Sequence, residues 1–375
     1  MTCPYCNNPV PAGAAECPAC GRLVPSAADA NPAAAPAAPQ PQQQPQPKLN
    51  SFKFPLRYVP ISATILVFCI VYLLGVICYD GFGAPSMFFD LFVDNAYIGI
   101  AAIGTALVIL TGGIDLSVGS VIAFTSILMA KMISSGSNAM LVILLALVLG
   151  TIFGFIQGWL IHYFSLPPFL VTLAGMFFVR GCAFLVNEDD IPIHDNPLFN
   201  FVKDNLSISI GEISIDFNVI IYILLLIIAI VFSQRTRSGR NIYAVGDNEL
   251  AATLMGIPVG RTKIMTYTIA GFCSALGGVA YSFYLTGGNA SNCVGLEMDA
   301  IAAVVIGGTL LTGGVGYVFG SLFGVLVLGL IQSLISFDGR INSWWTRIIV
   351  GLLMLAFIFM QNLITKISKS KSKSH

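Results

Sequence analysis

Long apolar stretches separated by short polar segments occupy most of the chain after residue 56. A helix needs about 20 apolar residues to cross the hydrocarbon core of a bilayer, where every backbone hydrogen bond has to be satisfied internally. Apolar residues make up 56% of the 375 residues and charged residues only 10%, whereas roughly 25% of an ordinary soluble domain is charged. The mean hydropathy is +0.84. The sequence therefore predicts an all-α polytopic membrane protein.

About ten membrane passes are expected from these stretches. They cover residues 57–79, 90–110, 117–134, 139–164, 167–187, 217–233, 264–286, 299–312, 316–336 and 344–362. The eighth stretch is too short for a straight crossing, so broken or tilted helices are expected beside it and beside its counterpart near residue 111.

The charged residues are segregated along the chain. Basic residues gather before the first pass, in the loop 234–263 and near the C-terminus. Because Lys and Arg mark cytoplasmic loops, both termini and this loop are expected in the cytosol. The acidic loops 188–216 and 287–298 are expected on the outside. The membrane domain is predicted to span residues 51–365, with a cytosolic basic tail at 366–375.

An internal repeat marks the membrane domain. Thr-Gly-Gly at residues 111–113 returns at 312–314, and a Gly-Ser pair follows each copy after five residues, at 119–120 and 320–321. The residues before each copy also match at the same offset. Such a repeat predicts a transporter built from two related halves. With ten passes both turns fall on one side of the membrane, whereas inverted repeats would place them on opposite sides, so the symmetry stays open.

Five residues near the two turns and the pass ends are candidates for the pathway of a transported molecule: Asn95, Gly112, Gly113, Asp115 and Asp299. Asp115 is the sharpest of them, since a carboxylate inside a membrane domain is costly and normally has a partner or water. It could accept hydrogen bonds from a substrate. It could equally cap the helix starting near Leu116, accepting from the N–H of Val118 or Gly119. The cap is favoured, because the second copy has no acid at the aligned Gly316.

The loop 234–263 contains the signals of a short helix. Asp247 is the expected N-cap, Gly256 the expected left-handed terminator, and Pro258 prevents continuation. Two i,i+4 pairs form an apolar face: Leu250 with Leu254 and Ala251 with Met255. Two turns of helix are too short to be stable alone, so the helix is expected to lie in a partner's groove. The alternative is a helix that lies on the membrane surface or on the protein's own loops.

The first 25 residues form a separate unit with two C-x-x-C pairs, Cys3 with Cys6 and Cys17 with Cys20. Four thiolates at this spacing can close a tetrahedral site for structural Zn²⁺ and leave no open position for catalysis. The unit resembles a short zinc ribbon; a redox pair or an unmetallated tail is the alternative. Residues 26–50 are rich in Ala, Pro and Gln, which predicts a disordered linker.

Residues 244–257 resemble the ATPase-coupling segment of permeases in the ribose/galactose class of bacterial ABC importers. The stretch 111–120 resembles the signature of that family, and residues 173–181 and 299–310 match it as well. With Phe337-Asp338-Gly339-Arg340 and the segment from Ser343, the pattern most resembles the galactofuranose-type branch. The similarity covers roughly residues 57–362; the Cys-rich head and the linker depart from it.

The resemblance implies a permease subunit of the bacterial plasma (inner) membrane that imports a monosaccharide by alternating access and is not itself an enzyme. It implies four kinds of partner: a cytosolic ABC ATPase that uses ATP, a second permease copy or paralogue, an external sugar-binding protein, and membrane lipid. Nucleic acid is not among them. The residues expected to couple the ATPase are Gly246, Asp247, Glu249, Leu250, Ala251, Leu254, Met255 and Gly256. The chain contains no Gly-Lys dipeptide and hence no P-loop of its own. Two rival classes are an ion-coupled secondary transporter and a zinc-sensing membrane protein.

Overall fold

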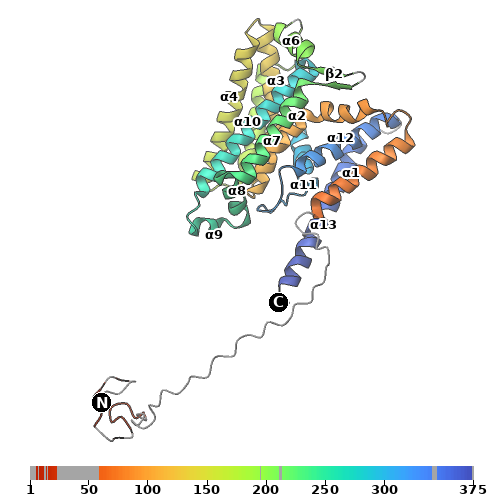
Figure 1. Cartoon of the computed structure of the whole chain (residues 1–375). Helices are drawn as coiled ribbons and strands as arrows, with labels where there is room; N and C mark the ends of the chain where they lie inside the picture. Colours follow the sequence, from red (N-terminus) through yellow and green to blue (C-terminus); the bar gives the residue numbers. More distant parts are fainter. Residues whose placement is uncertain are drawn as a thin grey trace. The chain divides into compact units, whose positions relative to one another are not determined.

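The computed structural model describes residues 6, 8–11, 14, 16–22, 59–194, 196–210, 213–339 and 344–373 (Figure 1). The chain divides into two units, Met1–Lys53 and Phe54–His375. The predicted linker at 26–50 lies outside the described residues.

The membrane unit is almost entirely helical. Its helices are α1 (Val59–Cys78), α2 (Pro85–Leu110), α3 (Val118–Ser134), α4 (Ala139–Tyr163), α5 (Pro168–Val186), α6 (Pro197–Asn205), α7 (Phe217–Arg235), α8 (Arg237–Asp247), α9 (Glu249–Leu254), α10 (Val259–Leu285), α11 (Leu296–Ile306), α12 (Gly320–Asp338) and α13 (Trp344–Lys373). Two short antiparallel pairs complete it: β1 (Ile191–Pro192) with β4 (Gly287–Gly288), and β2 (Ile208–Ile210) with β3 (Ile213–Ile215).

The prediction of a polytopic helical membrane protein is confirmed, whereas the expected number of about ten passes is not. Among the described residues, eight helices are long and apolar enough to cross a membrane. The other two expected passes are the short helices α3, of 17 residues, and α11, of 11 residues. Both flank the Thr-Gly-Gly turns, where broken or tilted helices were expected. The turns interrupt the helices there because glycines adopt backbone conformations that end a helix.

Helix α2 is the centre of the unit. In its most apolar stretch 83% of the residues are buried, compared with 11% in α1. It packs against α7, α10, α11 and α12. Its small residues allow this: the Gly99 backbone lies against the ring of Tyr222 in α7, and Gly104 against Ala270 in α10. Helices α1, α4, α5 and α13 surround this centre with largely exposed apolar faces, as lipid-facing helices do.

Helices α4 and α10 are packed through small residues. The stripe of Gly150, Gly154 and Gly158 in α4 lies against α10, and a methyl group added to Gly154 would lie 3.0 Å from Gly271 Cα and would also meet Tyr267 O. The backbones are therefore in direct contact, as expected for a small-residue stripe in a membrane protein.

The unit has two ends. Helices α8 and α9 lie at one end, called the α9 end, and α6 with the β2–β3 hairpin lies at the other, called the α6 end (Figure 1). Helix α7 connects them, and its 19 residues give it a length of about 28 Å. The sequence analysis did not predict α8, α6 or the hairpin, which are short: α8 has 11 residues, α6 has 9, and each strand has 3. Helix α13 continues beyond the expected end of the last pass at residue 362 and runs to Lys373.

We predict that Gly154→Ala lowers the stability of the purified protein by about 1–3 kcal/mol, because α4 and α10 have to separate to admit the methyl group. The measurement is the thermal unfolding of both variants in mild detergent. Gly351→Ala is the matched control, since nothing lies within 4 Å of a methyl group there. Equal unfolding temperatures for the two variants would contradict the close packing.

Candidate functional site

Three segments meet at the α9 end: the turn after α2, the end of α8, and the loop before α12. The N–H of Gly314 donates to Leu110 O at 3.0 Å. Gly246 of α8 packs on both residues, since a methyl group added to it would lie 2.5 Å from Gly314 N and closer still to Leu110 O. Gly313 lies against Gly112 in the same way, with 2.7 Å between an added methyl group and Gly112 N. These five residues are the glycine junction.

Glycine is required at the junction for two reasons. Gly112, Gly313 and Gly314 have φ values of +78°, +83° and +72°, which other residues rarely adopt. At Gly246 the reason is space, because the backbone of α8 touches the end of α2. As a result, a movement of α8 acts directly on the end of α2 and on the loop leading into α12.

The junction also answers the question of the repeat's symmetry. The turns at 111–113 and 312–314 are in contact at one end of the unit, so α2 and α11 approach this end in the same direction. An inverted repeat would have placed the turns at opposite ends. Gly113 closes the last turn of α2, since its N–H donates to Val108 O at 3.1 Å.

The expected short helix is α9, but its N-cap is Asn248 and not Asp247. The Asn248 side chain accepts from the N–H of Ala251 at 2.9 Å. Asp247 is instead the last residue of α8 and packs on Gly314. The prediction failed by one residue because a second helix ends immediately before α9, so that the single extended residue between the two helices has to be the cap.

The C-terminal end of α9 is as predicted. Gly256 has a φ of +76° and donates to Thr253 O at 3.0 Å, while Ile257 N donates to Ala252 O at 3.0 Å. This pair of bonds is a Schellman motif. Glu249, in the first turn of the helix, forms an ion pair with Lys263 Nζ of α10 at 2.7 Å. An exposed pair of this kind contributes roughly 0–1 kcal/mol and helps to orient the helix.

Helix α9 has one face packed against the rest of the membrane unit and another face that is exposed. Ala252 is fully buried and packs with Val245 of α8. Leu250, Leu254 and Met255 are 71%, 81% and 68% exposed. Ala251 is partly buried between the two faces. The predicted apolar face is therefore turned away from the rest of the unit.

Asp115 has a structural role that differs from both predictions in its details. It is only 2% exposed, and Oδ1 accepts from Ser117 N at 2.8 Å and from Ser117 Oγ at 2.6 Å. The expected donors, the N–H groups of Val118 and Gly119, are not its partners. A short acid bonds most easily to the backbone two residues on, so Asp115 fixes the loop before α3.

Two cavities open away from the α9 end, between α2, α10, α11, α12 and α13. The first has a volume of about 570 Å³ and its described lining residues are Asp299, Gln332, Ile335, Ser336, Gly339, Trp344, Thr346 and Arg347. The second has about 490 Å³ and is lined by Met87, Asp90, Asp94, Asn95, Tyr97, Tyr284, Gly329, Gln332, Ser333, Ser336 and Phe337. Gln332 and Ser336 belong to both, so the two volumes adjoin each other. They are called the outer cavities, and their sizes are those of ligand pockets.

The structure divides the five candidate pathway residues into two groups. Asn95 and Asp299 line the outer cavities. Gly112, Gly113 and Asp115 lie at the other end of α2. The 15 residues from Asn95 to the end of this helix at Leu110 correspond to about 20 Å of helix. Gln332 was not among the predicted pathway residues, although a lone amide in an apolar helix could have indicated it.

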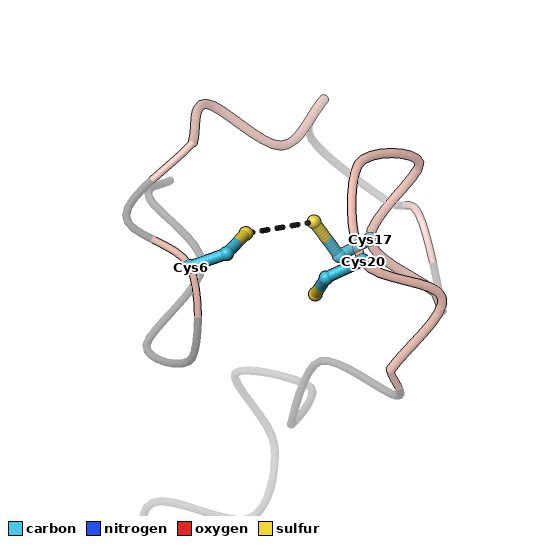
Figure 2. Close-up of side chains that lie close together, drawn as sticks. All are labelled: Cys6, Cys17 and Cys20. Carbon is cyan, nitrogen blue, oxygen red and sulfur yellow. Dashed lines mark hydrogen bonds between the residues drawn. The ribbon is translucent and has the colours of Figure 1, made fainter.

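The thiols of Cys6, Cys17 and Cys20 gather in the N-terminal unit, where the three Sγ atoms lie within 4.8 Å of one another (Figure 2). The Cys6 and Cys17 sulfurs are 3.6 Å apart. The pKa of Cys17 is lowered to about 7, chiefly because the backbone N–H of Ala19 donates to its sulfur. Cys3, the fourth expected ligand, lies outside the described residues.

Comparison with known proteins places the chain in a family of transport proteins. Residues 87–358, which include the glycine junction, α9 and the outer cavities, match the family described as branched-chain amino acid transport system / permease component. The chain therefore belongs to this family of permease components. The prediction of a permease subunit that is not an enzyme is confirmed.

Named relatives cover most of the chain. The inner membrane ABC transporter permease protein YjfF of Escherichia coli (strain K12) is 43% identical over 85% of this chain and 96% of its own length. The fructose import permease protein FruG of Bifidobacterium longum (strain NCC 2705) is 37% identical over 86% and 96%. The ribose import permease protein RbsC of Bacillus subtilis (strain 168) is 36% identical over 74% and 84%. No solved structure matches the chain.

We predict that Gly246→Ala loosens the glycine junction, because the added methyl group has to push Leu110 and Gly314 apart. Hydrogen–deuterium exchange in the peptides that contain these two residues should become about tenfold faster, as a local loss of about 1.4 kcal/mol implies. Gly181→Ala is the control, since nothing lies within 4 Å of a methyl group at that position. Unchanged exchange in Gly246→Ala would show that α8 is not held against α2.

Proposed function

We propose that this chain is the transmembrane subunit of an ABC importer for a monosaccharide of the galactofuranose, galactose or ribose kind. The names of the relatives support the class of substrate, since FruG and RbsC are named as import permeases for fructose and ribose. The outer cavities support it as well, because hydroxyl, amide and carboxyl groups alternate in them with aromatic rings. The sequence resemblance favours the galactofuranose-type branch.

The observation that carries the proposal is the outward apolar face of α9. Leu250 and Leu254 on this helix of six residues and Met255 at its C-cap are costly to leave in water, and such a helix is not stable without support. A groove on a separate cytosolic ABC ATPase would cover this face, as in helix-in-groove recognition. ATP would act on this chain only through that partner.

The proposed mechanism is alternating access driven through the glycine junction. ATP binding and hydrolysis in the partner would move α8 and α9, and the contacts of Gly246 with Leu110 and Gly314 would pass this movement to α2 and α12. These two helices line the outer cavities at their other ends. A shift at the α9 end would therefore change the width of the passage between α2 and α12.

The proposed orientation places the α9 end and both termini in the cytosol of a bacterium, and the outer cavities on the extracytoplasmic side of the inner membrane. The basic residues at the α9 end support it: Arg235, Arg237, Arg240, Arg261 and Lys263. An external sugar-binding protein would then deliver substrate at the α6 end. A second permease copy or a paralogue would complete the membrane part of the importer.

We propose in addition that Cys3, Cys6, Cys17 and Cys20 hold one structural zinc ion. The thiols of a tetrahedral zinc site with 2.3 Å bonds are about 3.8 Å apart, close to the 3.6 Å between Cys6 and Cys17. The lowered pKa of Cys17 supplies a thiolate near neutral pH. The ion would hold the N-terminal unit together, since its described apolar core consists of only a few residues.

We predict that Leu254→Glu abolishes association with the ATPase, because it puts a charge into the apolar contact. The measurement is the amount of ATPase that co-purifies with the permease from native membranes in mild detergent, which should fall about tenfold or more. Phe201→Glu is the control, since Phe201 is an exposed apolar residue at the α6 end. If no ATPase co-purifies with the wild-type chain, the proposed function fails and an ion-coupled secondary transporter becomes the better hypothesis.

We predict that the purified full-length protein contains about one zinc ion per chain, and that Cys20→Ser releases it while Cys69→Ser does not. Cys69 is an exposed cysteine of α1. Zinc ligands have to be deprotonated, so protons compete with the metal and zinc is retained at about pH 8 but lost toward about pH 5. Elemental analysis of the dialysed protein measures both effects. A zinc content that is independent of Cys20 would contradict the site.

A further inference from the structure

Helix α12 carries a polar stripe inside an otherwise apolar span. Gly329, Gln332, Ser333 and Ser336 are spaced three, four and seven residues after the first of them, so they share one face of the helix. This face lines the outer cavities. Polar side chains in a membrane helix commonly face the bundle interior or a water-filled cavity, where they can contact a transported molecule. We propose that Gln332, together with Asn95 of α2, recognises a neutral monosaccharide by forming hydrogen bonds to its hydroxyl groups.

Gln332 occupies the central position of this site. It is one of two residues that line both outer cavities, and it is partly buried. Its side chain makes no hydrogen bond to any of the described residues, although an amide offers donors and an acceptor at once. A sugar hydroxyl also donates and accepts. The amide of Gln332 can therefore bind a hydroxyl from either cavity without a change of charge.

Asn95 of α2 lines the wall of the site that lies opposite α12. It is 3% exposed, and its Nδ2 donates to Leu91 O at 2.9 Å. Its Oδ1 is buried and has no hydrogen-bond partner among the described residues, which leaves an acceptor that a ligand can use. The amide packs on Gly329, where an added methyl group would lie 2.8 Å from Asn95 Cγ. Separation of α12 from α2 would expose this acceptor to a sugar hydroxyl.

The rest of the lining selects the class of ligand. Tyr97 and Tyr284 stack with their ring centroids 5.9 Å apart, and Trp344 lines the other cavity. Aromatic rings of this kind offer flat apolar surfaces to the C–H faces of a sugar. Tyr284 OH donates to Asp94 Oδ1 at 3.2 Å, which orients the carboxylate at the edge of the rings.

The charges of the lining exclude anionic ligands. Asp90, Asp94 and Asp299 line the two cavities, and Arg347 is the one cationic residue among the described lining residues. The Arg347 guanidinium is already engaged, since Nη2 donates to Val294 O at 3.2 Å and the group lies 5.2 Å from the centre of the Trp344 ring. A sugar phosphate or sugar acid would meet net repulsion, whereas a neutral polyol would use the carboxylates as acceptors.

This inference rests on the proposed function and is tested by sugar uptake in cells that carry each variant in place of the wild-type chain. Labelled ribose, fructose, galactose and galactofuranose are the probes, and the one that is transported is used for kinetics. Gln332→Met, which keeps the shape and removes the amide, should raise KM about tenfold or more with little change in the maximal rate or in the amount of protein in the membrane. Ser336→Ala should raise KM by a smaller factor.

Gln361→Met is the matched control. Gln361 is a buried amide of the neighbouring α13 that donates to Val305 O at 3.0 Å and is not among the lining residues of the outer cavities. Its replacement should leave KM unchanged. If Gln332→Met and Ser336→Ala also leave KM unchanged while the wild type transports sugar, the inference is wrong and the proposed function stands. If the wild type transports none of these sugars in an ATP-dependent way, the proposed function itself fails.

Competition tests the selection against charge. Unlabelled neutral sugar should compete with the labelled probe, whereas its 6-phosphate should not compete at the same concentration. Competition by the phosphate would overturn the assignment of Asp90, Asp94 and Asp299 as the excluding charges. Stronger competition by an amino sugar than by the neutral sugar would show that the site is built for a cation, and would overturn the choice of a neutral ligand.

Discussion

The membrane unit depends on backbone contacts that only glycine permits at the α9 end. The hydrogen bond from Gly314 N to Leu110 O joins the two copies of the repeat, and the absence of a side chain at Gly246 lets α8 close over them. Packed interfaces of this density have few alternative arrangements, so a displacement of one backbone displaces the others. The repeated Thr-Gly-Gly sequence therefore lets two loops and a helix pack so closely that they move together.

The bilayer explains why the remaining helices are arranged around α2. In lipid, contact between apolar helices is not favoured by the hydrophobic effect, because the lipid tails are apolar too. Close packing and satisfied polar groups therefore decide which helices associate. Helix α2 packs closely through Gly99 and Gly104, and it carries the amide of Asn95 on the face toward α12. Helices without these features, such as α1 and α5, stay at the periphery and expose Leu, Ile and Phe.

The parts of this structure that follow from periodicity and glycine chemistry were predictable. Eight long apolar spans, the Gly256 terminator and the outward face of Leu250, Leu254 and Met255 could be read from the sequence. The N-cap at Asn248 could not, because it depends on where the preceding helix ends. Asp115 was placed in the right loop with the wrong donors, since an aspartate can bond locally in several ways. Gln332 and Asn95 were equally visible as lone amides, but only the packing of α2 against α12 shows that they serve one cavity.

The two proposed functional regions lie at opposite ends of the same helices. Leu110 at the end of α2 is in the glycine junction, and Asn95 of α2 is at the floor of the outer cavities; the loop through Gly314 leads into α12, which carries Gln332. The contact of Asn95 with Gly329 is thus the point where a movement begun at α9 would separate the two walls. A glycine on α12 at this contact presents no interlocking side chain, so little packing would have to be broken to open the proposed passage. A weakly binding site, made of single amides and hydroxyls, suits such a passage, because a permease has to release the molecule that it admits.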